Sequence, residues 1–169
     1  MSYSDRTEEW QYSIYYSQEL YEFKTKEDTE VFLSFFLTDA QLSNFLTVFP
    51  NPIEVLERGD INELMQIKKV GVKTAENILT RYNACKDKGK AYVELGKYGL
   101  SQNIIDRLIN RYNSPEIAIE KINSNPYILV NEVRGVGFKK ADEIALKTGI
   151  DPNSVERGVA FITYYFRVC

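Results

Sequence analysis

Two short segments of this chain combine the residue types that can hold a phosphate group. Residues 67–78 read IKKVGVKTAENI and residues 133–144 read VRGVGFKKADEI. In each, a glycine follows an apolar helix end, and a lysine, Lys73 or Lys139, comes two residues after it. The first N–H groups of a helix have no intrahelical partner, and the dipole makes that end positive. The two segments therefore predict backbone anion sites, each with a lysine that adds charge.

The residue order of both segments is the pattern of a helix-hairpin-helix. Its turn needs a residue that can take a positive φ and let another backbone approach, and we expect Gly71 and Gly137 to fill that place. Ala75 and Ala141 follow four residues later and are small, so the two helices of each hairpin can pack closely.

The candidate phosphate-binding residues lie in each turn or in the first helical turn after it. They are Lys68, Lys69, Gly71, Val72, Lys73 and Thr74 in the first segment and Arg134, Gly135, Gly137, Phe138, Lys139 and Lys140 in the second. A turn that only joins two helices is the structural alternative, but two copies in the same frame favour phosphate contact by at least one. The ring of Phe138 could stack on a base, although an aromatic side chain at this place more often packs inward.

Composition excludes several classes of function. The chain has 169 residues, a net charge of −3 and no histidine. An acidic chain argues against a protein whose whole surface is basic for nucleic acid, yet local phosphate sites remain possible and predict modest affinity. The two cysteines, Cys85 and Cys169, have no metal spacing, and no carboxylates are spaced for a two-metal site. We therefore expect no catalytic or metal-binding residues. No segment suits a membrane span or a signal peptide, so a cytoplasmic setting is the default.

The chain from Thr25 onward reads as a series of short helices. Four helix starts are expected where a polar residue precedes a proline: Asn51-Pro52, Ser114-Pro115, Asn125-Pro126 and Asp151-Pro152. The last apolar stripe at helical spacing consists of Val155, Val159, Ile162 and Phe166. Residues 1–24 are rich in tyrosine and fit a strand or an irregular arm as well as a helix.

An internal repeat sets the predicted architecture. Residues 37–52 match residues 100–115 at an offset of 63, whereas the glycine segments are 66 apart, so the second copy has three extra residues. The fold is predicted to be all-α, with two tandem helix-hairpin-helix units. Each unit begins with a degenerate hairpin without the glycine signature, near 37–40 and 98–102, which makes four hairpins in total.

The predicted domain boundaries follow from the repeat. Residues 1–28 form a short N-terminal arm, for which an extended structure and a remnant of a preceding domain are both open. Residues 29–85 form the first unit, residues 86–90 a charged linker, and residues 91–169 the second unit.

The second unit resembles a specific family. It has YGLS at 98–101, NPYIL at 125–129, GVGFKKADEIA at 135–145, and then Arg157 with Ala160. These motifs, in this order, are similar to those of the N-terminal region of RecD-like superfamily 1 DNA helicases, of the exodeoxyribonuclease V alpha-subunit type. The resemblance is strongest over 98–166 and extends over about 29–169.

That resemblance implies helical units that precede an ATP-dependent 5′-to-3′ motor, in a family associated with DNA repair and recombination. This sequence contains no G-x-x-x-x-G-K-[ST] phosphate loop. We therefore expect no cofactor in this chain and assign ATP and Mg²⁺ to a motor domain of a parent protein, from which this chain would be an excised or truncated piece. The resemblance leaves open whether the parent acts in repair, phage replication or conjugation.

Three functions are compatible with these features. The first is a module that holds single-stranded or forked DNA through its backbone, without reading sequence, and positions the helicase. The second is a protein-interaction scaffold whose degenerate hairpins dock a helicase or nuclease partner subunit, which an exposed aromatic patch at the N-terminus would favour. The third, suggested by the repeat alone, is a junction-binding or ligase-type accessory.

Overall fold

The computed structural model describes residues 22–169, and every regular element in that range is helical. The predicted all-α fold is confirmed. The interpretations of the N-terminal arm and its aromatic patch fall mainly on residues 1–21, outside the described part of the chain. Residues 22–24 are in no regular element. None of the helices between residues 22 and 169 has the length and apolar character to cross a bilayer.

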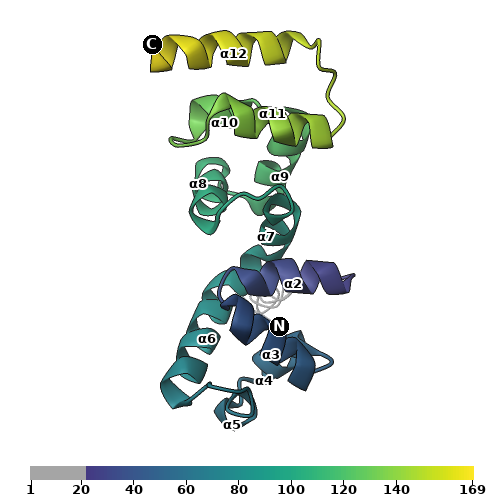
Figure 1. Cartoon of the computed structure of the whole chain (residues 1–169), viewed down its shortest axis with the longest axis vertical. Helices are drawn as coiled ribbons and strands as arrows, with labels where there is room; N and C mark the ends of the chain where they lie inside the picture. The colour runs from purple at the N-terminus through teal and green to yellow at the C-terminus, as the bar shows by residue number, and fades with distance from the viewer. Residues whose placement is uncertain (1–21) are drawn as a thin grey trace, which may run out of the picture. The chain divides into compact units, whose positions relative to one another are not determined.

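The chain divides into two compact units after Gly89. The first contains α2 (Lys26–Ser34), α3 (Asp39–Val48), α4 (Pro52–Arg58), α5 (Ile61–Leu64), α6 (Val72–Cys85) and the short 3-10 turn η1 (Lys86–Lys88). The second contains α7 (Gly89–Gly96), α8 (Gln102–Tyr112), α9 (Pro115–Ser124), α10 (Ile128–Glu132), α11 (Phe138–Lys147) and α12 (Val155–Val168) (Figure 1). Helix α2 begins inside the predicted arm. The predicted linker 86–90 is helical, because η1 continues directly into α7.

The order of helices repeats between the two units. Helices α2–α6 correspond to α7–α11, and α12 follows in the second unit. Helix α4 has seven residues and α9 has ten, so the three extra residues of the second copy lie within this helix. The insertion therefore lengthens a helix, and the same two hairpin helices follow it in both units.

Two of the four expected starts at a proline are displaced. Asp151 and Asn125 each use the side chain to accept a backbone N–H two residues later, from Asn153 at 2.8 Å and from Tyr127 at 3.1 Å. Such a turn is the other common use of Asp or Asn before proline. Helix α12 consequently begins at Val155 and α10 at Ile128. The starts at Pro52 and Pro115 are confirmed.

Aromatic packing holds the degenerate hairpin of the first unit against its glycine hairpin. Phe32 of α2 is fully buried, with its ring centroid 5.4 Å from that of Phe36 and 6.1 Å from that of Tyr82 in α6. Edge-to-face pairs at these distances add to the stabilisation from apolar burial. The hydroxyl of Tyr82 donates to Glu57, and burial together with this bond raises the pKa of Tyr82.

Helix α12 packs on α10 and α11 through a face that the apolar pattern did not identify (Figure 1). The predicted stripe is helical, but it is exposed: Val155 76%, Val159 55%, Ile162 56% and Phe166 78%. The contacting face carries Arg157, Ala160 and Arg167 instead. Ala160 is buried, Arg157 binds Asp142, and Arg167 Nη1 donates to the carbonyl of Val130 at 2.6 Å. The same face also contributes aromatic contacts, since Phe161 packs on Phe138 and Tyr164 lies beside Gly137.

The positive φ angles of the two hairpin turns lie two residues before the expected glycines. Lys69 has a φ of 67° and Gly135 a φ of 97°, whereas Gly71 and Gly137 are extended, with φ of −96° and −83°. The prediction of a positive φ at Gly71 and Gly137 was therefore wrong. The chain reverses at the left-handed residue, and the later glycine is the residue from which the next helix starts.

This geometry predicts opposite effects of two substitutions on stability. Lys69→Gly should raise the free energy of unfolding by about 1 kcal/mol, because the left-handed region costs a residue with a Cβ roughly 1–2 kcal/mol and unfolded-chain entropy returns part of it. Gly135→Ala should lower it by about 1 kcal/mol, and a Cβ there would meet no atom within 4 Å, so the cost is the backbone alone. Urea titrations without DNA measure both changes in the free energy of unfolding. If neither substitution changed it, the left-handed conformation at positions 69 and 135 would be contradicted.

Candidate nucleic-acid interface

The first glycine hairpin, formed by α5, residues 65–71 and α6, presents an uncapped helix N-terminus. Gly71 is the N-cap of α6, and no side chain caps that end. The first intrahelical bond runs from the Ala75 N–H to the Gly71 carbonyl at 2.9 Å, so the amides of residues 72–74 precede it. The first turn of α6 contains no acidic residue. These donors and the helix dipole suit an anion.

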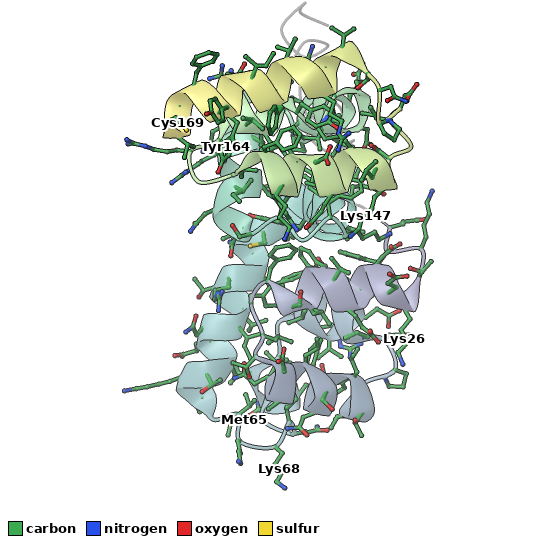
Figure 2. The ribbon with its side chains drawn as sticks, turned by 45° about the horizontal axis from the view of Figure 1, so that its top comes forward. Lys26, Met65, Lys68, Lys147, Tyr164 and Cys169 are labelled. Atoms are coloured by element: carbon green, nitrogen blue, oxygen red, sulfur yellow. The ribbon has the colours of Figure 1, made fainter. Side chains whose placement is uncertain are left out.

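The surroundings of this end are open and positively charged. Lys68, Lys69 and Lys73 are exposed, and Val72 is 48% exposed. Figure 2 shows Lys68 projecting from this end of the first unit. A Cβ on Gly71 would meet no atom within 4 Å. The fold of the chain therefore does not require glycine at position 71, whereas close approach of an outside group to its backbone would.

The second glycine hairpin, formed by α10, residues 133–137 and α11, has the same start but less space. Gly137 is the uncapped N-cap of α11, and the Ala141 N–H donates to its carbonyl at 3.3 Å. Tyr164 of α12 lies over this glycine, with its hydroxyl 3.5 Å from the place that a Cβ would occupy. The N-terminus of α11 is therefore partly covered by a side chain of α12.

The predicted residues of the second hairpin divide into two groups. Arg134 and Lys139 are exposed. Phe138 packs against protein, with its ring centroid 6.0 Å from that of Tyr127 and 5.3 Å from that of Phe161. Lys140 Nζ lies 2.9 Å from the place of a Cβ on Gly99, in the turn between α7 and α8. Arg134 and Lys139 are the more exposed of these side chains, whereas Phe138 and Lys140 are partly covered by protein.

Comparison with known families concerns mainly the second unit. A family model described as the ATP-dependent RecD2 DNA helicase HHH domain matches residues 84–168. The chain belongs to this family. No solved structure matches the chain. The matched range contains α7–α12 and therefore the whole second glycine hairpin, whereas the first glycine hairpin precedes it.

A cluster of hydrogen bonds around the carboxylate of Asp142 ties α12 to the second glycine hairpin. Asp142 accepts from Arg157 Nε at 2.8 Å, from Arg157 Nη2 at 2.9 Å and from the Tyr127 hydroxyl at 2.7 Å. The hydrogen bonds from Arg157 and then Tyr127 lower the pKa of Asp142, although partial burial opposes them. Burial and the bond to Asp142 raise the pKa of Tyr127 to about 12. The charge of Asp142 is thus balanced by Arg157 rather than opposing an anion at the hairpin.

The structure also brings together residues that we did not predict as site residues. Gln41, Asn77 and Arg81 join Lys73 and Thr74 around a pocket beside the first hairpin. Lys73, Asn77 and Arg81 are four residues apart, so helical periodicity could have placed them on one face of α6. Gln41 comes from α3, which is distant from α6 in the sequence, so no sequence pattern could have predicted that it lines this pocket.

Asp142→Asn should loosen α12 and lower the free energy of unfolding by about 1–2 kcal/mol at neutral pH, because a partly exposed bidentate pair is lost. The pKa of Asp142 is lowered by folding, so its stabilisation is present above an unfolded pKa of about 4 and is lost as pH falls through the folded value. The difference between wild type and variant in urea titrations should therefore shrink in acid. Glu143→Gln is the control, because its carboxylate is 4.0 Å from Lys140 and half exposed. Equal effects of the two variants would contradict this role.

Proposed function

We propose that this chain is a sequence-non-specific DNA-backbone-binding module that positions a RecD-like 5′-to-3′ helicase motor on its substrate. The observation that carries this proposal is the uncapped N-terminus of α6, which has exposed lysines around it and no acidic residue in its first turn. Membership of a RecD2 helicase domain family supports a helicase-associated DNA-binding module.

The proposed contacts are hydrogen bonds from backbone amides to phosphate oxygens. At the first hairpin the donors are the N–H groups of Gly71, Val72 and Lys73, and the side chains of Lys68 and Lys69 add charge. Contacts of this kind position a protein on nucleic acid and do not read its sequence. With about four phosphates neutralised, the slope of log affinity against log salt would be roughly −3 to −4.

The first hairpin is the proposed principal contact, because Gly71 is open on its outer side and Gly137 lies under Tyr164. Arg134 and Lys139 of the second hairpin offer a further contact through their exposed charges. Single-stranded or forked DNA is the proposed ligand. ATP hydrolysis and its Mg²⁺ are assigned to a motor domain of the parent protein.

Lys73→Glu should weaken binding to fluorescently labelled single-stranded DNA about tenfold, because it replaces one favourable charge by repulsion at a phosphate contact. Gly71→Ala should weaken it too, without a loss of stability, because its Cβ meets only the incoming phosphate. Lys139→Glu should have a smaller effect. Fluorescence anisotropy at two salt concentrations, with single-stranded, duplex and forked DNA, measures all of these.

The matched control is Lys147→Glu, which makes the same charge change at the other end of α11, away from the hairpin (Figure 2). Its effect on affinity should be less than that of Lys73→Glu or Lys139→Glu, and circular dichroism checks the fold of every variant. If Lys147→Glu weakened binding as much as Lys73→Glu, the affinity would reflect overall charge and not a hairpin contact.

A protein-interaction scaffold is the second candidate function, and the outer face of α12 favours it. Val155, Phe166 and Val168 are 76%, 78% and 65% exposed, and several other large apolar residues of α12 are more than half exposed. Contiguous exposed apolar surface is typical of a protein contact. The proposed partner is a helicase or nuclease subunit. Folded protein that binds no DNA even at low salt would favour this function over the first.

A further inference from the structure

A polar pocket lies along α6, beside the first glycine hairpin. It has a volume of about 240 Å³ and is lined by Phe36, Gln41, Lys73, Thr74, Asn77, Ile78 and Arg81. One water molecule needs about 10–15 Å³ of such space, so the pocket has room for several waters. The pocket is therefore large enough for a phosphate group with part of its hydration shell.

The lining suits an anion. Lys73 and Arg81 are positively charged, Thr74 and Asn77 are neutral polar residues, and no carboxylate is among the lining residues. The side-chain oxygen of Gln41 accepts the Thr38 N–H at 3.0 Å, so its NH₂ group remains a donor. Donors of several kinds therefore converge from two helices.

Arg81 is fixed in position before any ligand binds. Its Nη1 donates to the carbonyl of Phe36 at 3.1 Å and its Nη2 to that of Phe35 at 2.9 Å. Within residues 22–169 it forms no salt bridge. A guanidinium has five N–H donors in a planar fork, and these two bonds leave three. A held guanidinium with spare donors loses little entropy when it binds a phosphate.

The pocket continues the hairpin site along one face of α6. Lys73, Asn77 and Arg81 occupy successive turns, and at ~1.5 Å per residue Arg81 is about 12 Å along the helix from Lys73. The amides at the start of α6 are at one end of this row and the turn between α2 and α3 is at the other. Lys73 is part of both the hairpin and the pocket lining.

We propose that this pocket binds a second phosphate of the same DNA strand, next to the one held by the amides at the start of α6. The inference rests on the proposed function of the first hairpin. It assigns phosphate-binding roles to Arg81, Asn77 and Gln41. It also places the path of the strand along α6, from the glycine hairpin towards the degenerate hairpin.

The test compares two substitutions that make the same charge change on α6. Asn77→Asp puts a carboxylate into the pocket, whereas Asn83→Asp puts one on another face of the helix, outside the pocket lining. Both residues are exposed, so both variants should fold. We expect Asn77→Asp to weaken binding of a labelled oligothymidylate of about twelve nucleotides by about tenfold, and Asn83→Asp by less than about threefold.

The hairpin variant Gly71→Ala, measured beside them, separates this inference from the proposed function. A larger loss for Asn77→Asp than for Asn83→Asp, together with a loss for Gly71→Ala, supports the second site. Equal effects of the two aspartates with a clear loss for Gly71→Ala overturn the second site alone. Folded wild-type protein that binds no oligonucleotide overturns both.

Discussion

The reversal of the chain within each glycine hairpin is the constraint on which the rest of the structure depends. One residue in the left-handed region turns the chain, and an extended glycine then starts the next helix. Because that glycine has no side chain to cap the helix, the first amides of α6 and α11 keep their donor capacity. The first copy uses Lys69 for the turn and bears the backbone strain, whereas the second uses Gly135. The same reversal brings Ala75 and Ala141 into the core, where both are fully buried.

The sequence was sufficient for the all-α fold and the repeat, because both depend on local patterns that occur twice. Even the three-residue offset was readable, and the structure places it in α9. The sequence was misleading where one residue type serves two purposes. Glycine marks a positive φ and also marks a place without a Cβ, so Gly71 was given a role that Lys69 fulfils. Asp before proline marks a helix cap and also a local turn, so the start of α12 was placed three residues early.

The candidate site was less predictable than the fold, because its surroundings come from distant parts of the chain. The residue types of the second hairpin gave its charges, but not the cover of Tyr164 over Gly137 or the pairing of Asp142 with Arg157. Both depend on which face of α12 packs inward. Apolar periodicity chose the wrong face, since the inward face of this helix combines arginine hydrogen bonds and a small alanine with the rings of Phe161 and Tyr164. That face mixes charged, small and aromatic residues, so the stripe of aliphatic and aromatic residues on the opposite side gave the stronger apolar pattern.

The two units share an architecture but not an equal capacity for an anion. In the first unit the hairpin amides are open and a carboxylate-free pocket adjoins them. In the second unit α12 packs over the hairpin and presents an apolar face outward. An anion site needs exposed donors, whereas a protein contact needs exposed apolar area, and each unit has mainly one of these. A chain with a net charge of −3 can bind DNA only where its donors are concentrated. The DNA-binding and scaffold functions are therefore compatible within one chain, because they would use different units.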